Sequence, residues 1–482
     1  MMKEYVMGFD IGTGSSKAVL TDLEGNIAAK FSKNHSIEVS HPGWQEESME
    51  MWWKEFKTAV KQFLEGGVKP QEIRAIGVTG LLPALCPVDR QGNVLRNAML
   101  HTDVRAVEEL EWIHKKLDEG ISHGHMLSKI LWVKNNEPDI YEKTEKIMVP
   151  HGFIAYKLTG QVSIDYDAAS MIGGVFDEET LDWNEENLKK VGIEKDILPI
   201  PVPATTVLGT VSKKAAKETG LSEETKVIAG VGDTFASILG GGAYNAGHLM
   251  IYLGTSATVL YTEESPRHYL SIPHYGPKKG HFVGKIASFG ESIMHLRQNL
   301  RYDGWDELNA GLDEIPPGSE GLWYFPHYKL QTEKTCFGSD AEYMLGFRGR
   351  HTQFHMYHAM LEGIASNIKY NITQFDYPVQ QINVFGGGAN SKEILQIFAD
   401  IIGQELYYNP KSSTALGIAF LAGYGSGYIK DYSVLPDIWF GDSRKIVPDR
   451  ERAEAYRVYY AQYQALREEL MKLDKKYAQR EE

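Results

Sequence analysis

The sequence predicts an α/β protein of two lobes with a cleft between them. Its 482 residues allow two or three domains rather than one. An apolar strand, a glycine-containing loop and a second apolar strand follow one another over 5–21, and the same order returns over 248–262. We interpret this repetition as an internal duplication, with lobes over 1–245 and 246–482 that join near 243–250. Interfaces between domains are the preferred place for a ligand pocket.

The bulk composition excludes several classes of protein. With 43% hydrophobic and 24% charged residues, the chain is globular and not disordered. A net charge of −14 argues against a nucleic-acid partner, because a protein that binds a duplex needs a basic face. An acidic protein can still bind ATP, since backbone N–H groups, a lysine and a bound cation supply positive charge locally.

The N-terminus and the cysteines predict a cytoplasmic protein. The chain meets a charge too early for a signal peptide, and no apolar stretch approaches the roughly 20 residues that span a membrane. The two cysteines, Cys86 and Cys336, are too few for a disulfide framework and show no zinc spacing. We therefore expect two reduced structural thiols and no membrane partner.

Apolar periodicity and turn residues predict the elements of the first lobe. Strands over 5–11, 17–21 and 27–32 form an antiparallel meander. Its second turn is Glu24-Gly25-Asn26, because glycine and asparagine tolerate positive φ. The further elements that we predict are helices over 49–64, 104–118, 127–136 and 151–158, and a strand over 72–78.

The same patterns predict the elements of the second lobe. They are strands over 248–253, 257–262 and 382–385, and helices over 391–403 and 449–476. One face of the last helix carries Tyr456, Tyr459, Tyr463, Leu466, Leu470 and Leu473. This face favours core packing, or the seam of a homodimer, over a ligand site.

A single carboxylate, Asp233, ends an apolar segment that begins at Lys226 and passes through Gly230 and Gly232. A buried strand of this kind can deliver an acid to the floor of a cleft. An alcohol is a poor nucleophile, and a nearby carboxylate orients its hydroxyl and accepts the proton as the O–P bond forms. We interpret Asp233 as the general base of a phosphoryl transfer. An aspartate that precedes Thr234 also fits a helix N-cap.

The segment Asp10-Ile-Gly-Thr-Gly-Ser-Ser-Lys17 has the composition of a phosphate-binding loop. Its glycines let the backbone approach a ligand, and its hydroxyls and lysine can face phosphate oxygens. These residues are Gly12, Thr13, Gly14, Ser15, Ser16 and Lys17. Lys17 replaces the third glycine of a dinucleotide fingerprint, and the ending of a Walker A loop is missing. The alternative is an ordinary hairpin turn.

Two glycine-containing turns in the second lobe are candidate nucleotide contacts. Leu253-Gly-Thr-Ser-Ala-Thr258 also has the composition of a phosphate-binding loop. The turn Gly386-Gly-Gly-Ala-Asn390 follows a strand and suits the close approach of a flat base or ribose, with Asn390 as a polar contact. The alternative is a crowded strand-to-helix turn.

Asp10 stands at the end of the first apolar strand, directly before the first loop. A carboxylate there could hold Mg²⁺, usually through water, because Mg²⁺ retains most of its hydration shell. The alternative is an aspartate that caps the turn. His123 and His125 flank a glycine without a carboxylate at metal spacing, so we expect them to be satisfied within the protein or to make polar contacts to substrate, and not to bind zinc.

These motifs coincide in one family, and the chain resembles the FGGY carbohydrate kinases from Met7 to about Gly427. Besides the segments above, the resemblance rests on His41-Pro-Gly-Trp-Gln-Glu46, Asp103-Val-Arg105, Lys129-Ile-Leu-Trp-Val-Lys-Asn-Asn136 and His355-Met-Tyr-His-Ala-Met-Leu-Glu-Gly363. Each is weak alone, while their order and spacing are specific together. Residues 125–160 and the His-Pro-Gly-Trp-Gln-Glu run look most like xylulokinases.

The resemblance implies two ribonuclease-H-like lobes of the actin/Hsp70/sugar kinase superfold, and ATP-dependent phosphorylation of a sugar or polyol. It places the sugar and the base Asp233 in the first lobe and the nucleotide in the second. The implied ATP contacts are Gly12, Thr13, Gly14, Ser15, Lys17, Gly254, Thr255, Gly387, Gly388 and Asn390. The implied substrate contacts are Leu82, Pro83, His101, Asp103, Asp233 and Thr234, and the implied metal ligands are Asp10 and Asp233.

Departures from the family pattern fall where the sugar binds. The run Leu81-Leu82-Pro83 is apolar where relatives carry hydrogen-bonding groups, His101 replaces a common tryptophan, and Thr234 often is asparagine. Because sugar specificity rests on hydrogen bonds to individual hydroxyls, these changes bear on the substrate and not on the chemistry.

We therefore predict a cytoplasmic Mg-ATP-dependent sugar kinase, with D-xylulose as the leading substrate. Gluconate, another ketopentose and a polyol are the alternatives within the family. Two alternatives of other classes are an actin- or Hsp70-like nucleotide switch, for which no peptide-binding appendage is visible, and a catalytically silent sugar sensor.

Overall fold

The structure is a computed structural model that describes residues 3–117, 120–254, 256–264, 278–299, 305–326, 342–373 and 378–478. The chain divides into two units. The first comprises Met1–Gly240, Glu264–Lys279 and Ser413–Gly441, and the second comprises Gly241–Glu263, Gly280–Ser412 and Asp442–Glu482. None of the helices in the described ranges combines the length and the apolarity that a membrane crossing requires.

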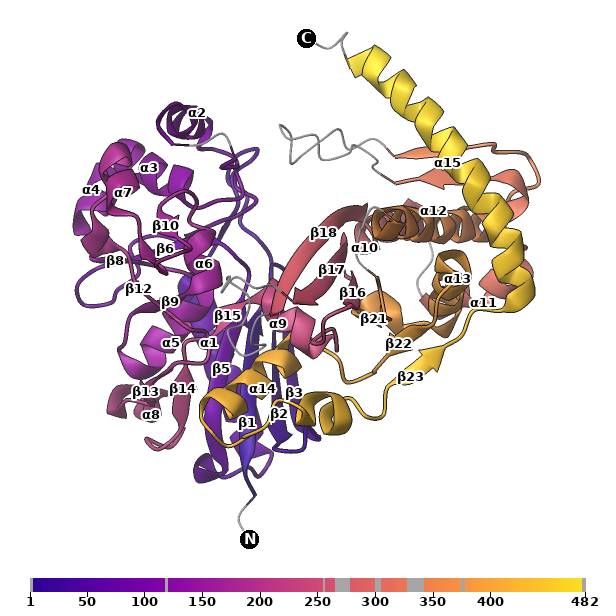
Figure 1. Ribbon diagram of the computed structural model, residues 1–482. Helices are drawn as coiled ribbons and strands as arrows, with labels where there is room; N and C mark the ends of the chain where they lie inside the picture. Colours follow the sequence, from indigo (N-terminus) through magenta and orange to yellow (C-terminus); the bar gives the residue numbers. More distant parts are fainter. Residues whose placement is uncertain are drawn as a thin grey trace. The chain divides into compact units, whose positions relative to one another are not determined.

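The first unit is built on a seven-stranded sheet, in which β1 is antiparallel to β2 and parallel to β5 (Figure 1). The strand order is β13-β14-β5-β1-β2-β3, and β15 also pairs with β5. The strands are β1 (Tyr5–Ile11), β2 (Ser15–Asp22), β3 (Ile27–Asn34), β5 (Ile73–Gly80), β13 (Val207–Thr210), β14 (Lys226–Ile228) and β15 (Val231–Gly232). The predicted opening meander is confirmed, and Gly25 has a φ of +79° in its second turn.

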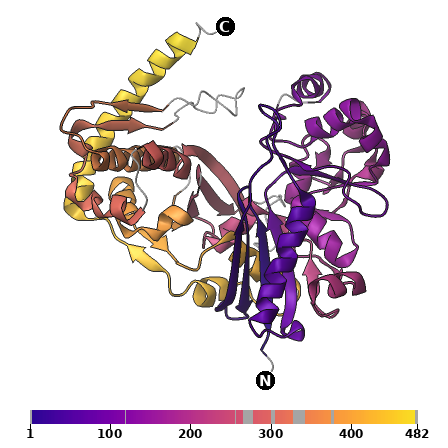
Figure 2. The same cartoon turned by 180° about the vertical axis from the view of Figure 1, so that it is seen from behind.

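Helices α1 (Met49–Glu65) and α14 (Thr414–Gly425) cover opposite faces of this sheet (Figures 1 and 2). Successive side chains of a strand point to opposite faces. Phe9 of β1 meets Phe56 of α1 with ring centroids 5.2 Å apart. Its neighbour Gly8 faces α14, where a Cβ would lie 1.9 Å from the carbonyl oxygen of Ala415. The sheet therefore has one face filled by large side chains and one face on which backbone meets backbone.

The contact of α14 with α9 (Asp233–Gly240) also depends on glycine. A Cβ at Gly240 would lie 2.0 Å from the carbonyl oxygen of Ser413, and a Cβ at Gly417 would lie 2.0 Å from that of Ala236. This packing places Ser413–Gly441 in the first unit, whereas the sequence predicts a single second domain over 246–482.

A four-stranded sheet and a group of helices complete the first unit around a second apolar core. The sheet has the order β4-β7-β6-β8, from β4 (Glu46–Glu47), β7 (Ala98–Leu100), β6 (Ala84–Val88) and β8 (Lys146–Met148). The helices of this core are α2 (Val107–Lys116), α3 (Leu127–Asn136), α4 (Pro138–Lys143), α6 (Tyr166–Ser170) and α7 (Glu185–Val191). The apolar side chains of α5 (Pro150–Thr159) and α8 (Lys213–Thr219) instead pack in the core of the seven-stranded sheet. Short strands β9 (Ser163–Asp165), β10 (Phe176–Asp177), β11 (Asp182–Trp183) and β12 (Ile200–Val202) connect them.

The second unit repeats the arrangement of the first strands, since β16 is antiparallel to β17 and parallel to β21. Its main sheet has the order β18-β17-β16-β21-β22-β23, and β19 and β20 form a separate pair. The strands are β16 (His248–Leu253), β17 (Ser256–Glu264), β18 (Lys278–Ser288), β19 (Trp323–Phe325), β20 (Tyr343–Leu345), β21 (Gln381–Phe385), β22 (Leu406–Tyr408) and β23 (Arg444–Ile446). The helices are α10 (Gly290–Asn299), α11 (Trp305–Ala310), α12 (Gln353–Thr373), α13 (Lys392–Ile402) and α15 (Arg450–Ala478).

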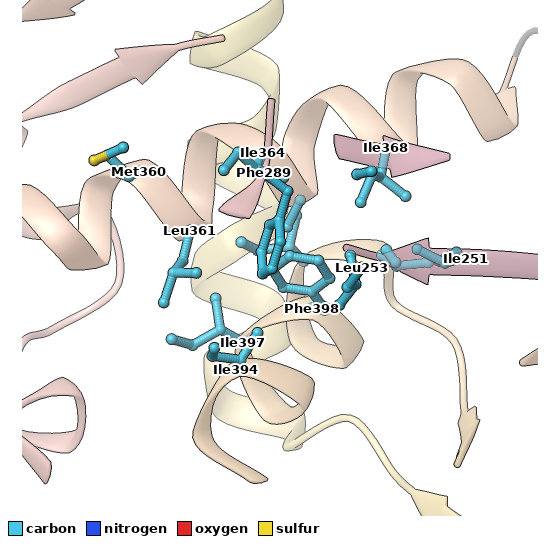
Figure 3. Packing of buried hydrophobic residues seen from close by; sticks show 14 of the residues in the cluster. Ile251, Leu253, Phe289, Met360, Leu361, Ile364, Ile368, Ile394, Ile397 and Phe398 are labelled. Carbon is cyan, nitrogen blue, oxygen red and sulfur yellow. The ribbon is translucent and has the colours of Figure 1, made fainter. Parts of the chain in front are cut away.

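The core of the second unit lies among β16, α12 and α13, and Figure 3 shows side chains from all three. Phe289 packs edge-to-face on Phe398 of α13, with centroids 6.3 Å apart. The aromatic face of α15 belongs to this core, because Tyr463 is fully buried and stacks on Phe325 at 4.7 Å. Of the two interpretations of that face, core packing is confirmed. A homodimer stays a prediction.

Candidate active site

Three parallel strands of the first unit end at one edge of the sheet and bring the two predicted acids there. Strand β5 pairs in parallel with β1, where Asp10 is opposite Thr79, and with β15, where Gly232 is opposite Gly80. The carboxyl ends of parallel strands are the common place for ligand sites in α/β sheets. Asp10 near the end of β1 and Asp233 directly after β15 therefore share this edge.

Asp233 is delivered by a strand that is broken just before the edge. Gly230 interrupts it with a φ of +84°, and a Cβ there would lie 2.1 Å from the carbonyl oxygen of Val78. Asp233 then opens α9, and its Oδ1 accepts a hydrogen bond of 2.7 Å from the backbone N–H of Thr234. Burial raises the pKa of Asp233 to about 6, against the lowering effect of Thr234. A helix N-cap accepts from an N–H two or three residues further on, so this contact with the adjacent N–H does not confirm the cap.

A buried histidine–aspartate pair adds to the electrostatics of Asp233. His151 at the start of α5 lies with Nε2 2.7 Å from Oδ2 of Asp165, and both side chains are fully buried. The charge of His151 acts to lower the pKa of Asp233. Sequence reasoning missed this pair, and a histidine and an aspartate that flank an apolar helix were its only signal.

The carboxylate of Asp10 is almost fully buried, and its Oδ1 finds no hydrogen-bond partner among the described residues. Burial, and after it the charge of Asp233, raise the pKa of Asp10 to about 7, against the lowering effect of Lys17. Lys17 is opposite Asp10 in the register of β1 and β2. The unpartnered Oδ1 argues against the alternative in which Asp10 only caps the turn, because a capping carboxylate would accept hydrogen bonds from the N–H groups of the turn.

Asp10 and Asp233 fit the demands of Mg²⁺. Within the described ranges, no group of three or more His, Cys, Asp and Glu side chains could hold a metal ion. Mg²⁺ needs no such group, since it binds through one or two carboxylates together with water and substrate phosphates. A cation at Asp10 would satisfy the orphaned oxygen and offset the mutual repulsion that raises the pKa. The assignment of the metal stays a prediction.

The predicted phosphate loop is the turn between β1 and β2. The backbone N–H of Gly12 donates to the carbonyl of Ser15 at 3.0 Å and closes the turn. Thr13, Gly14 and Lys17 are exposed or half-buried, and no atom lies within 4 Å of a Cβ placed on Gly14. The tip is therefore open to a ligand. Ser16 is fully buried and does not contribute to this open surface.

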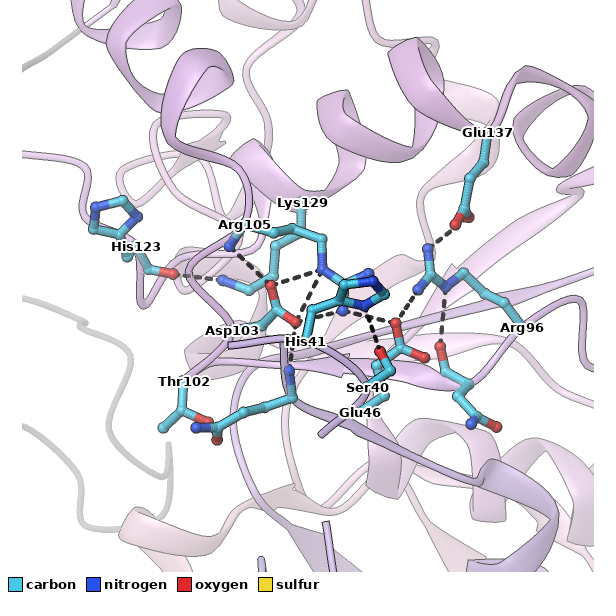
Figure 4. Close-up of polar contacts among 12 residues, drawn as sticks. Ser40, His41, Glu46, Arg96, Thr102, Asp103, Arg105, His123, Lys129 and Glu137 are labelled. Atoms are coloured by element: carbon cyan, nitrogen blue, oxygen red, sulfur yellow. Dashed lines mark hydrogen bonds and ion pairs between the residues drawn. The ribbon is translucent and has the colours of Figure 1, made fainter. Parts of the chain in front are cut away.

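A polar network holds the segments around Asp103 together (Figure 4). Asp103 is buried, and its Oδ2 accepts from Nη2 of Arg105 at 2.6 Å and from the backbone N–H of Gln45 at 2.7 Å. The guanidinium of Arg105 also contacts Glu46 at 2.7 Å and lies 3.7 Å from the ring centroid of Trp44. Both oxygens of Asp103 thus accept hydrogen bonds from groups of the protein. Its carboxylate therefore suits a role in holding the neighbouring segments in place.

Lys129 anchors the turn that carries the two candidate histidines (Figure 4). Its Nζ is buried and donates to the carbonyl oxygens of His123 and His125, the latter at 3.2 Å. Burial lowers the pKa of Lys129 to about 8. The Nδ1 of His125 accepts from the backbone N–H of Ser122 at 3.0 Å, and both His123 and His125 are half-buried. Lys129 begins one of the family motifs, but sequence reasoning assigned it no role, although a lysine inside the apolar face of a helix was a signal.

The apolar residues before β6 lie close to the base. A Cβ on Gly232 would meet the side chain of Leu82 at 2.5 Å, so Leu82 packs over the residue that precedes Asp233. Pro83 is buried, and His101 and Thr234 are half-buried. The structure therefore brings Leu82 and Thr234 to the base.

In the second unit, two glycine turns meet at the carboxyl ends of β16 and β21. A Cβ at Gly386 would lie 2.5 Å from the carbonyl oxygen of Leu253, directly before Gly254. Gly388 packs under Phe289, while Gly387 is open, because no atom lies within 4 Å of a Cβ placed on it. The Oδ1 of Asn390 accepts from the hydroxyl of Tyr408 at 2.9 Å. Thr255 lies outside the described residues.

Comparison with known proteins covers nearly the whole chain. Residues 5–240 match the N-terminal domain of the FGGY family of carbohydrate kinases, and residues 249–426 match its C-terminal domain. The xylulose kinase of Bacillus subtilis (strain 168) is 26% identical over 95% of this chain and 96% of its own length. That of Staphylococcus epidermidis (strain ATCC 12228 / FDA PCI 1200) is 28% identical over 97% of both chains.

A solved structure extends the likeness to the fold. The crystal structure of xylulose kinase from Rhodospirillum rubrum matches with a TM-score of 0.81 and 25% identity, over 98% of this chain and 99% of that chain. The predicted α/β fold with two ribonuclease-H-like lobes of the sugar kinase superfold is confirmed by this match. The chain belongs to the FGGY family of carbohydrate kinases.

Proposed function

We propose that this protein transfers the γ-phosphoryl group of ATP to a hydroxyl of a ketopentose, with D-xylulose as the first substrate to test. The observation that carries the proposal is the half-buried carboxylate of Asp233, with its raised pKa, at the strand edge that it shares with Asp10. Full-length similarity to proteins named xylulose kinase supports the choice of sugar. The predicted cytoplasmic location fits the use of ATP.

In this proposal, Asp233 accepts the proton of the attacking hydroxyl as the O–P bond forms and the bond to the leaving ADP breaks. A pKa of about 6 leaves the carboxylate largely unprotonated at neutral pH, yet basic enough to take up a proton. Asp10 and Asp233 would hold Mg²⁺, which when bound neutralises charge on the phosphates.

The nucleotide contacts that we propose come from both units. In the first unit they are the turn residues Gly12, Thr13, Gly14, Ser15 and Lys17. In the second they are Gly254, Thr255, Gly387, Gly388 and Asn390. The open space over Gly14 and Gly387 supports this choice, because backbone N–H groups there can approach an anion closely.

Sugar hydroxyls are proposed to meet His101, His123 and Thr234, with Leu82 and Pro83 as the apolar wall. The Lys129 anchor supports His123, because it fixes the turn that presents the imidazole. Asp103 acts indirectly, by holding the segment of His101 through Arg105 and Gln45. An apolar wall beside the base discriminates less among hydroxyl patterns, so gluconate and polyols remain the alternative substrates.

A coupled assay of ADP release with Mg-ATP and a panel of sugars tests the proposal. We expect D-xylulose to give a kcat/KM at least about tenfold above gluconate and glycerol, the discrimination that one or two hydrogen bonds provide. ADP release that no sugar changes would favour a nucleotide switch. Binding of sugar and ATP without any phosphosugar product would favour a sugar sensor. Either outcome contradicts the kinase.

The pH dependence of kcat/KM provides a second test. Because Asp233 must be unprotonated to act, the rate should rise with pH through an apparent pKa of about 6 and then level off. A bound cation stabilises the carboxylate form, so saturating Mg²⁺ should move this limb to lower pH. A rate that is flat from about pH 5 to pH 8 would remove Asp233 from the titrating step.

A further inference from the structure

Behind the turn between β1 and β2 lies a buried group of three titratable side chains, His35, Glu47 and Glu55. Their side chains are 3%, 0% and 2% exposed, respectively. They come from the segment after β3, from β4 and from α1. The Nδ1 of His35 lies 3.1 Å from Oε2 of Glu55, and its Nε2 lies 3.6 Å from Oε2 of Glu47.

The same imidazole reaches the turn itself. The Nε2 of His35 lies 2.9 Å from the carbonyl oxygen of Gly12, and the backbone N–H of His35 donates to the carbonyl of Gly14 at 3.1 Å. A carbonyl oxygen can only accept, so Nε2 carries a hydrogen. His35 therefore holds the carbonyls of both glycines of the turn, that of Gly12 through its side chain and that of Gly14 through its backbone.

The protons in this group follow from the same donor and acceptor rules. With Nε2 donating to Gly12, the contact between Nδ1 and Glu55 needs one shared proton, on the imidazole or on the carboxyl group. Glu47 accepts a hydrogen bond of 2.7 Å from the indole N–H of Trp52, and burial raises its pKa to about 7. Glu55 is thus the carboxylate that supports His35 directly.

The peptide geometry connects this anchor to the ligand side of the turn. In a trans peptide, the carbonyl of Gly12 and the N–H of Thr13 point in opposite directions in one plane. With the carbonyl directed inward to His35, the N–H of Thr13 is directed outward at the exposed tip. A glycine turn is otherwise conformationally free, and ordering it on binding would weaken affinity.

We propose that His35 is a positioning residue that preorganises the turn between β1 and β2 for the phosphates of ATP. The inference rests on the proposed function of that turn. His35 touches no substrate; it fixes the Gly12–Thr13 peptide, and Glu55 fixes the imidazole. The amide of Thr13 thereby becomes a ready donor to a phosphate oxygen.

Two substitutions of the same residue separate this role from general stability. In His35→Gln, the amide nitrogen takes the place of Nε2, so the donor to Gly12 is kept while the contact to Glu55 is lost. In His35→Asn, the amide nitrogen takes the place of Nδ1, so the donor to Gly12 is lost. We expect His35→Asn to raise the KM for ATP about tenfold, as the loss of a hydrogen bond of about 1.4 kcal/mol does. The KM for the sugar should stay within about twofold, and His35→Gln should stay near the wild type.

Lys17→Met, at the exposed end of the same turn, distinguishes failure of this inference from failure of the proposed function. If Lys17→Met raises the KM for ATP and His35→Asn does not, the positioning role is overturned while the phosphate turn stands. If neither substitution changes it, both are overturned. Equal increases in both KM values, or a change in melting temperature alone, would show a structural role and overturn the inference.

Glu55→Leu keeps the test valid if His35→Asn does not fold. It removes the group that fixes the imidazole through Nδ1, so we expect the KM for ATP to rise about three- to tenfold with the sugar KM unchanged, whereas Glu55→Gln, whose amide N–H can donate to Nδ1 and keep the hydrogen on Nε2, should stay near the wild type. An unchanged KM for ATP in Glu55→Leu would overturn the proposal.

Discussion

Asp233→Asn should lower kcat by about 10²- to 10⁴-fold, the range that general base catalysis supplies, and leave the Kd for ATP within about threefold. The amide cannot accept the proton of the sugar hydroxyl. Its oxygen can still accept the hydrogen bond from the N–H of Thr234, so the start of α9 should stay intact. The effect should therefore appear in the chemical step and not in folding.

Single-turnover phosphate transfer and nucleotide titration, measured on the same sample, check this expectation. Asp177→Asn is a matched control, because the Asp177 carboxylate also accepts backbone N–H groups, from Glu179 at 2.8 Å and Thr180 at 3.2 Å, but lies outside the proposed site. Its activity should equal that of the wild type. Retention of more than about a tenth of the wild-type rate in Asp233→Asn would exclude the carboxylate as the base.

Gly8→Ala should destabilise the protein by more than about 3 kcal/mol or prevent its folding, because overpacking against backbone cannot be relieved by a rotamer change. The new Cβ would lie 1.9 Å from the carbonyl oxygen of Ala415 and 2.8 Å from the backbone nitrogen of Ala419. Either β1 or α14 has to move. Both elements belong to the central sheet packing of the first unit, so we expect the unit to lose its stability as a whole and not locally.

Thermal unfolding followed by circular dichroism measures this loss. Gly417→Ala should act in the same direction, since its Cβ would lie 2.0 Å from the carbonyl oxygen of Ala236. Gly349→Ala is the control, because no atom lies within 4 Å of a Cβ at that position, and its stability should change by no more than about 0.5 kcal/mol. A melting temperature of Gly8→Ala equal to that of the control would contradict the packing of α14 on the sheet.

Local patterns in the sequence predicted the elements that depend on near neighbours. The strand predicted over 5–11 is Tyr5–Ile11, and the helix predicted over 49–64 is Met49–Glu65, because apolar side chains at strand and helix spacing meet the same core. The family motifs singled out Asp10 and Asp233. The structure places both at one edge of the sheet, because Asp10 lies near the end of β1, Asp233 directly follows β15, and both strands pair with β5.

The features that the sequence did not reveal depend on distant partners. His35 meets Glu55 and Gly12 only after β2, β3 and α1 have folded together. In the sequence, Lys129 does not differ from other helix residues. Its role depends on hydrogen bonds from its ammonium to the carbonyls of the preceding turn, which form only in the folded protein. The place of α14 was equally hidden, because its glycines have a role only opposite another backbone.

The return of Ser413–Gly441 to the first unit has a consequence for biosynthesis. On the ribosome, the leading sheet emerges long before the helix that covers its glycine face has been translated. Until about residue 425 has left the exit tunnel, that face stays bare, and the nascent polypeptide is open to misassociation or to chaperones. The order of synthesis thus obliges the N-terminal half to wait for the C-terminal half before it can mature.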